Sequence, residues 1–163
     1  MKLIMIKGYS KTGKTTSCTA LIGELVRRGH TVGSIKDIHF EGFAIDREGS
    51  DTSRHAAAGA RTVAALGLRE TDVLYQRRLT PAELLRHFHE DFLVCEGDCG
   101  LACANLVTGR TTEDLERRRD ERTVGFTGIV AGELHEYDGL PVISAVEAIE
   151  ALADLVEERS TAI

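Results

Sequence analysis

The sequence predicts an α/β protein with a mostly parallel sheet flanked by helices. Apolar runs suited to buried strands, such as Leu3–Ile6, alternate along the chain with segments of helical periodicity. The composition agrees, because 16 glycines against two prolines and a hydrophobic share of 42% suit many strand-to-helix turns around a core. The length of 163 residues is enough for one domain and too short for two ordinary ones. We therefore expect residues 1–163 to form a single domain.

The first part of the chain predicts a strand, a helix and a second strand. The apolar run within residues 2–7 is typical of a buried strand. Residues 15–28 place apolar side chains on one side of a helix, and Gly29 stands where a C-terminal cap is expected. Residues 31–36 predict the next strand. Because such units are parallel and right-handed, the turn before the helix should lie at the carboxyl edge of the sheet.

The next segment predicts a loop, a helix and two strands. Residues 37–49 lack periodicity and hold two glycines, which indicates a loop at the same edge. Ser50 is a suitable N-cap for a helix at residues 51–60, whose first turn is acidic. Residues 61–66 predict a third strand. Residues 72–76, rich in Val, Leu and Tyr, predict a fourth that is antiparallel or at an edge.

The second half begins with a strong helix start. Thr80, Pro81 and Glu83 combine a capping threonine, a proline at the first helical position and an acid three residues after the cap, so a helix is expected to about His89. Residues 91–95 are short and apolar and predict a strand. The remaining predicted elements are a charged helix at 112–122, strands at 123–131 and 141–144, and an amphipathic helix at 145–158.

One motif lies between the first strand and the first helix. Residues Gly8–Thr15 read GYSKTGKT and fit the pattern G-x-x-x-x-G-K-[ST]. A strand that ends in a glycine-rich turn and restarts as a helix directs backbone N–H groups at one point, which suits a phosphate. The motif therefore predicts a P-loop NTPase fold. The residues expected to contact a nucleotide here are Gly8, Ser10, Lys11, Thr12, Gly13, Lys14, Thr15 and Thr16.

Two of these residues and one later acid have expected chemical roles. Lys14 should reach the β- and γ-phosphates, and the Thr15 hydroxyl should bind Mg²⁺. A phosphate loop also needs an acidic residue for the metal, normally at the end of a neighbouring apolar strand. Glu96 directly follows the strand predicted at residues 91–95, and Asp98 could share the task through water. We expect Lys14 and Glu96 to be the catalytic residues of any hydrolysis.

Several segments together resemble one known family. They are Gly8–Thr16, Ile35-Lys36 with His39, the pattern Asp46–Ala60 and Glu96-Gly97. The chain is similar over these residues to the MobB family of molybdopterin-guanine dinucleotide biosynthesis proteins. It departs from the family pattern at Asp37 and over the segment Asp98–Cys103. No [NT]-K-x-D guanine-recognition motif is present, so a preference for GTP over ATP rests on the resemblance.

The resemblance implies a function that the motif alone does not. It implies a GTP-binding accessory protein with weak GTP hydrolysis at most, which assists a molybdopterin guanylyltransferase-type partner and is usually a homodimer. It also implies that Asp46, Asp51 and Arg54 lie near the nucleotide. By itself, Asp51 is about as well explained as an acid at a helix N-terminus.

The cysteines leave two interpretations open. Cys95, Cys99 and Cys103 are spaced C-x₃-C-x₃-C in a glycine-containing loop. Three thiolates could hold an iron–sulfur cluster or zinc, with Cys18 or a residue of a second subunit as the fourth ligand. They could equally be small, partly buried thiols that line a turn. A metal- or cluster-carrying NTPase is therefore one alternative function.

Charge and composition limit the other functions. A net charge of −6 argues against a nucleic-acid partner, because phosphate backbones bind basic surfaces. The short N-terminal apolar run is neither a signal peptide nor a membrane span, so we expect a cytoplasmic protein with no membrane partner. A small-molecule kinase is a second alternative, with Arg77, Arg78 and Arg110 as lid candidates. The run Arg117–Arg119, flanked by acids, predicts a solvated helix face.

Overall fold

The computed structural model describes all of residues 1–163. Backbone contacts divide the chain into two compact units, one made of Met1–Asp37 with His87–Ile163 and the other of Ile38–Arg86. The first unit holds a six-stranded sheet and a small two-stranded one, and the second unit holds a two-stranded sheet of its own. The prediction that residues 1–163 form a single domain stays a prediction.

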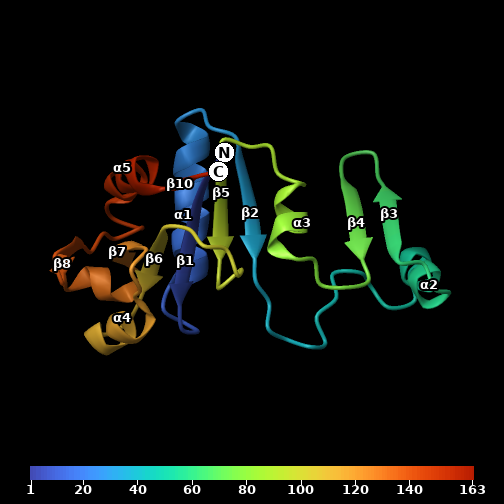
Figure 1. The fold of residues 1–163 in the computed structure, drawn as a ribbon, viewed down its shortest axis with the longest axis horizontal. Coiled ribbons are helices and arrows are strands. Elements are labelled where there is room, and N and C mark those ends of the chain that lie inside the picture. Colours follow the sequence, from blue (N-terminus) through green and yellow to red (C-terminus); the bar gives the residue numbers. More distant parts are fainter. The chain divides into compact units, whose positions relative to one another are not determined.

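A parallel sheet forms the centre of the first unit (Figure 1). Its strands, in spatial order, are β2 (Val32–Lys36), β5 (Phe92–Glu96), β1 (Lys2–Gly8), β6 (Asn105–Thr108) and β7 (Thr123–Thr127). Every neighbouring pair on this path is parallel. The mostly parallel sheet flanked by helices, predicted from the sequence, is confirmed.

The order of the strands brings distant segments to one edge. The chain leaves the sheet after β2 and returns as β5, which inserts between β1 and β2. Ile6 on β1 and Lys36 on β2 are therefore both paired with Glu96 at the end of β5. The carboxyl ends of three strands meet beside the turn that follows β1.

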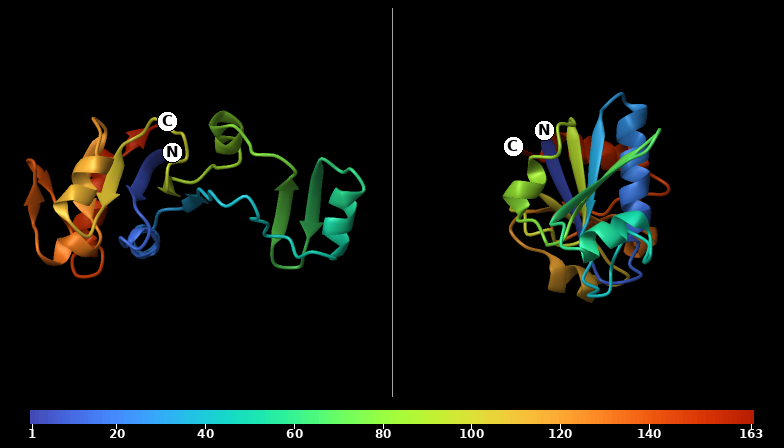
Figure 2. Two further views of the ribbon diagram at one scale, coloured as in Figure 1. Left: turned by 90° about the horizontal axis from the view of Figure 1, so that it is seen from below. Right: turned by 90° about the vertical axis from the view of Figure 1, so that its right-hand side faces the viewer.

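The centre of the sheet is buried on both faces. Residues 3–6 of β1 and 92–95 of β5 are almost fully shielded from solvent, as expected for parallel strands covered by helices. The strand β10 (Thr161–Ala162), which the sequence analysis missed, pairs antiparallel with the start of β1. The Ile163 N–H then donates to the Met1 carbonyl at 3.0 Å, so the two termini lie side by side (Figures 1 and 2).

Helix α1 (Lys14–Arg27) and helix α5 (Ile149–Arg159) pack against each other. α1 ends as predicted: Gly29 has a φ of +92°, and the N–H groups of Gly29 and His30 donate to the carbonyls of Val26 and Leu25. α5 begins four residues later than predicted, because residues 145–147 form a turn that the Ala148 N–H closes on the Ser144 carbonyl. None of the helices has the length and apolar composition needed to cross a membrane.

Beyond the cysteine loop, two predictions need correction and one strand was not predicted. Strand β6 was missed, and it pairs with β1. The helix expected at 112–122 is α4 (Thr112–Arg118) and ends sooner. The strand expected at 123–131 ends at Thr127, because Gly128 adopts a φ of +90° and the chain continues as the 3₁₀ turn η1 (Ile129–Gly132).

The strand predicted at 141–144 is also wrong over most of its length. The structure has a short hairpin there, made of β8 (Glu136–Tyr137) and β9 (Leu140–Pro141). Beyond it, Val142 makes only an isolated parallel bridge to Phe126. The hairpin turns at Asp138 and Gly139, which both have positive φ angles. The apolar residues before α5 are explained by packing, since Val142 and Ala145 are buried in the core.

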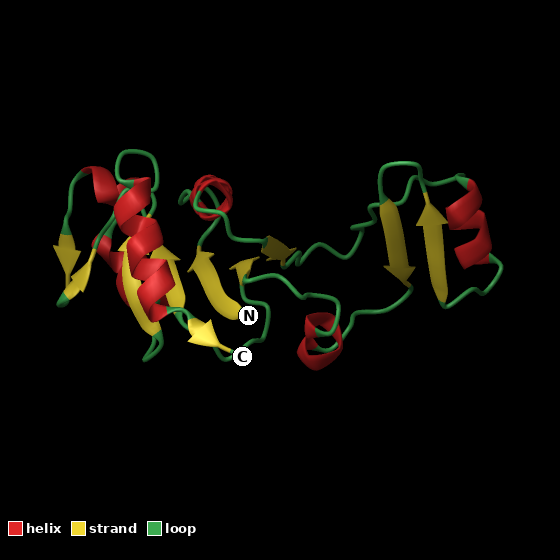
Figure 3. Cartoon of the chain, turned by 90° about the horizontal axis from the view of Figure 1, so that it is seen from above, coloured by secondary structure: helices red, strands yellow, loops and turns green.

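The second unit is a hairpin with a short helix beside it (Figure 3). Strands β3 (Thr62–Leu66) and β4 (Thr71–Tyr75) pair antiparallel in a sheet separate from the central one. Helix α2 (Asp51–Ala57) has the predicted Ser50 cap and ends before Gly59, whose φ is +106°. Helix α3 (Pro81–Leu85) has the predicted capping box but ends four residues sooner than expected.

Candidate functional site

The turn between β1 and α1 requires glycine at two positions. Gly8 has a φ of +154°, and a Cβ placed there would lie 2.1 Å from Thr108 Oγ1 and 2.6 Å from the Thr108 carbonyl oxygen. Gly13, with a φ of +101°, is the N-cap of α1 and offers no capping side chain. The first N–H groups of α1 therefore have no side-chain acceptor, and they favour an anion at this helix end.

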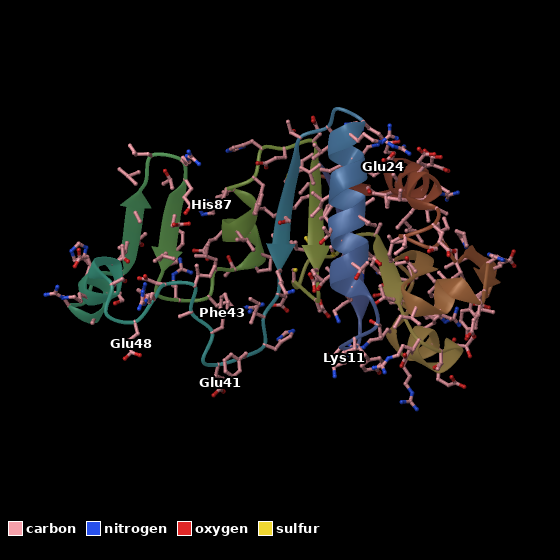
Figure 4. All side chains as sticks on the ribbon, turned by 180° about the vertical axis from the view of Figure 1, so that it is seen from behind. Lys11, Glu24, Glu41, Phe43, Glu48 and His87 are labelled. Carbon is pink, nitrogen blue, oxygen red and sulfur yellow. The ribbon has the colours of Figure 1, made fainter.

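Thr12 fastens the turn to the neighbouring strands. Its side chain is fully buried, and Thr12 Oγ1 lies 2.8 Å from the Tyr9 carbonyl and 2.6 Å from Thr108 Oγ1. The Ile129 N–H also donates to the Thr12 carbonyl at 3.3 Å. The turn is thus held by β6 and by the segment after β7. Lys11, which Figure 4 labels near the start of α1, is exposed and has a positive φ.

Lys14 lies against the turn itself. Its ammonium donates to the Tyr9 carbonyl at 2.5 Å. Burial lowers the pKa of Lys14, the nearby charges of Arg118 and Lys36 lower it further, and Glu96 opposes the shift. The cation is therefore held close to the backbone that would surround a phosphate, in a region that already carries other positive charge.

Thr15 and Glu96 meet at the edge of the sheet. The Thr15 hydroxyl donates to Glu96 Oε1 at 2.7 Å, and the Lys36 ammonium lies 3.0 Å from the same oxygen. In the sequence, Lys36 appears only within the family pattern, with no role of its own. Its contact follows from the register of β2 and β5, which pairs Lys36 with Glu96.

These oxygen atoms suit a magnesium ion. A threonine hydroxyl and a carboxylate are hard ligands of the kind that Mg²⁺ prefers, and Mg²⁺ is commonly bound by one or two such groups together with phosphate oxygens and water. Glu96 is only partly exposed, and Lys36 balances its charge. The residues predicted from the sequence for the metal, Thr15 and Glu96, are thus brought together by the fold.

Asp46, Asp51 and Arg54 belong to the second unit. Asp46 Oδ1 accepts hydrogen bonds from the hydroxyls of Ser50 and Thr52 at 2.8 and 3.0 Å. Asp51 lies in the first turn of α2 and is 3.4 Å from Arg54. Asp51 therefore stands in the acidic first turn of α2, the structural position weighed for it from the sequence.

The cysteines form a buried group rather than an arranged metal site. Cys18, Cys95, Cys99 and Cys103 are all buried thiols. Burial raises the pKa of Cys18 to about 12 and that of Cys103 to about 11. A hydrogen bond with Cys99 and burial raise the pKa of Cys95 strongly. No group of three or more His, Cys, Asp or Glu side chains is placed to hold a metal ion, and thiols with raised pKa values give up their protons to a metal reluctantly.

Two arginines reach the turn from the segment after β6. Arg110 Nη2 donates to the Ser10 carbonyl at 3.2 Å. The guanidinium of Arg118 lies 4.3 Å from the centre of the Tyr9 ring. The sequence predicts Arg118 only as part of a solvated helix face. Its contact with Tyr9 was missed because no local pattern links α4 to Tyr9.

Comparison with known proteins identifies the family. The model of the family described as "Molybdopterin guanine dinucleotide synthesis protein B" matches residues 3–122. The chain belongs to the MobB family. The resemblance drawn from Gly8–Thr16, Asp46–Ala60 and Glu96-Gly97 is therefore confirmed, and it spans both units of this MobB-family chain.

Individual relatives agree with this assignment. The chain is 26% identical over 152 residues to a probable molybdopterin-guanine dinucleotide biosynthesis adapter protein of Bacillus subtilis. The aligned region covers 90% of this chain and 87% of that protein. It is 43% identical over 61 residues to the molybdopterin-guanine dinucleotide biosynthesis adapter protein of Haemophilus influenzae. That aligned region covers 37% of this chain and 34% of the other protein. The crystal structure of B. subtilis MobB shares the fold, with a TM-score of 0.80 at 24% identity over the full length of both chains.

Proposed function

We propose that this MobB-family chain binds GTP with Mg²⁺ at the turn between β1 and α1 and acts as an accessory protein in molybdopterin-guanine dinucleotide biosynthesis. The observation that carries the proposal is the 2.7 Å contact between Thr15 Oγ1 and Glu96 Oε1 beside the uncapped start of α1. The pathway and the guanine nucleotide are supported by the family and by the names of its adapter proteins. A kinase or a cluster carrier is not favoured by this family assignment.

Each residue of the turn has a role in the proposal. The N–H groups around Gly13 and the ammonium of Lys14 would bind the phosphates, after Lys14 exchanges the Tyr9 carbonyl for phosphate oxygens. Thr15 and Glu96 would hold Mg²⁺, which supplies charge neutralisation on the phosphates. Lys36 would hold the Glu96 carboxylate in place through their 3.0 Å ion pair. Any GTP hydrolysis is proposed to be weak.

The second unit contributes two further parts of the proposal. Asp46, Asp51 and Arg54 are proposed, from the family pattern, to act near the nucleotide. The unit also exposes large apolar side chains, at Phe40, Phe43, Ile45, Leu66 and Leu68. Figure 4 labels Phe43 on the loop before α2.

We propose that a second copy of the chain covers these exposed apolar side chains in a cytoplasmic homodimer, because a two-stranded sheet is marginally stable alone. The pathway partner is proposed to be a molybdopterin guanylyltransferase-type protein. Light scattering should give a dimer mass for the wild type and a monomer mass for Leu66→Asp. A monomeric wild type would contradict the dimer.

The magnesium site is tested by replacing Glu96. Glu96→Gln keeps the shape of the side chain and removes its charge, so the Mg²⁺ concentration needed for half-maximal GTP binding should rise roughly 10–100-fold, the range for lost metal-orienting groups. Glu158→Gln is the matched control, because Glu158 is an exposed carboxylate of α5 that pairs with Arg159 and has no place in the proposed site. An unchanged Mg²⁺ requirement in Glu96→Gln would remove Glu96 from the site.

A further inference from the structure

Arg118 differs from its neighbours on α4. Arg119 is paired with the carboxylates of Glu116 and Asp138. Arg118 is exposed and forms no such ion pair; its guanidinium lies instead over the ring of Tyr9, in the second position of the turn. A cation on an aromatic face keeps its N–H edge available for another acceptor.

Arg118 lies beside the candidate phosphate site, because it contacts a residue of the phosphate-binding turn. The Tyr9 carbonyl is the group that holds the Lys14 ammonium, so Arg118 and Lys14 contact the same residue from its side chain and from its backbone. Two cations held this close repel each other, and an anion that contacts both removes the repulsion.

The segment that carries Arg118 is fixed to the turn at a second point. Arg110, just before α4, donates to the Ser10 carbonyl, and the Gly109 carbonyl accepts from the Val130 N–H at 2.9 Å. The start of α4 is also closed by the Thr111 cap. The helix therefore presents Arg118 from a position set by backbone contacts rather than from a loose loop.

We propose that Arg118 is a second phosphate-binding cation of this site, held beside the turn by Tyr9 and used together with Lys14 when a nucleoside triphosphate binds. The proposal rests on the proposed nucleotide binding and adds a residue to it. The ligand group is the polyphosphate and not the base, because Tyr9 and Ser10, which Arg118 and Arg110 contact, both belong to the phosphate-binding turn.

The test compares GTP with inorganic tripolyphosphate, which carries the phosphates alone. By competition titration, Arg118→Ala should weaken both ligands about tenfold, the size of one charge-assisted contact. Arg118→Lys should recover part of the loss because it keeps the charge. Arg117→Ala, an exposed arginine one residue away, should bind both ligands as the wild type does.

A coupling measurement separates phosphate binding from a merely structural role. Tyr9→Leu removes the ring that holds Arg118, so it should weaken both ligands less than Arg118→Ala does and add little to Arg118→Ala in the double variant. Unchanged affinities in Arg118→Ala, a loss for GTP but not for tripolyphosphate, or an equal loss in Arg118→Lys and Arg118→Ala would each overturn the proposal.

The proposed function and this inference fail in different ways. Lys14→Ala, measured beside the arginine variants, should lose both ligands more severely than Arg118→Ala. If the wild type binds GTP and Lys14→Ala does not, while Arg118→Ala equals the wild type, only the role of Arg118 is refuted. If the wild type binds neither GTP nor tripolyphosphate, the proposed function is refuted and the role of Arg118 is refuted with it.

Discussion

Gly8→Ala tests whether the turn needs the tight backbone approach seen at the end of β1. The added Cβ would lie 2.1 Å from Thr108 Oγ1, 2.6 Å from the Thr108 carbonyl oxygen and 2.9 Å from Thr12 Oγ1. All three distances are shorter than non-bonded contacts allow, and one of these atoms is backbone that cannot rotate away. The residue also has a φ of +154°, a conformation that side chains disfavour.

The expected loss of free energy of unfolding has two sources, the overlap of the added Cβ with its neighbours and the disfavoured backbone conformation. Overpacking a closed site costs about 1–3 kcal/mol and a disfavoured backbone conformation about 1–3 kcal/mol, so the free energy of unfolding should fall by about 2–6 kcal/mol. That is a large part of the stability of a typical domain, which is roughly 5–15 kcal/mol. Urea unfolding followed by circular dichroism would measure the difference.

Gly23→Ala is the matched control for this measurement. Gly23 lies within α1, is exposed, and a Cβ added there would meet nothing within 4 Å. Alanine in a helix interior should stabilise the protein by about 0.5–1 kcal/mol. If Gly8→Ala unfolds at the same urea concentration as the wild type, the close packing of the turn against β6 is refuted.

Two further predictions concern ionisation. Hydrogen bonds from Arg27 and Arg28 hold the pKa of Glu24, which Figure 4 labels near the far end of α1, at about 2, below its ordinary 4.5. The stabilisation from this carboxylate should be complete above pH 4.5 and lost as the pH falls towards 2, so the stability gap between wild type and Glu24→Gln should narrow from pH 7 to pH 3; a constant gap would contradict this. The thiols of Cys18 and Cys95, buried and with raised pKa values, should react with iodoacetamide at pH 8 far more slowly in the folded protein than in urea, and equal rates would show that they are accessible.

The parts of the fold that follow from local chemistry could be predicted from the sequence. Gly8 and Gly13 mark the turn because only glycine tolerates its backbone angles and contacts, and Gly29 ends α1 for a similar reason. Ser50 and Thr80 cap their helices with side chains that need only the next three residues. Such signals are complete within a few positions, so no tertiary information is needed to find them.

Strand β6 could not be predicted in the same way. It has only four residues, and its first and last, Asn105 and Thr108, are polar. Both can be buried because side chains from other parts of the chain form hydrogen bonds with them. Asn105 is hydrogen-bonded to Asp120 and Thr123, and Thr108 to Thr12. The burial of these polar groups is decided by tertiary contacts, which no window of the sequence contains.

The residues of the candidate site are of the same two kinds, those that local sequence signals predict and those that only tertiary contacts bring to the site. Lys14 and Thr15 are fixed by the motif, and Glu96 by its place after an apolar strand. Lys36 and Arg118 reach the site through strand register and helix packing, so their contacts appear only in the folded chain. The cysteine spacing predicted a metal site equally well as a buried turn, and burial of all four thiols agrees with the second interpretation.

The most direct test of the central claim is calorimetric titration of GTP into wild-type protein and Lys14→Ala, each in the presence of Mg²⁺. The wild type should bind one GTP per chain. Lys14→Ala should unfold at the same temperature as the wild type, because its ammonium contacts only the carbonyl of the turn, yet bind GTP at least about 100-fold more weakly, as expected for a lost cation on a polyphosphate. Equal affinity of the two folded proteins for GTP would contradict nucleotide binding at this turn.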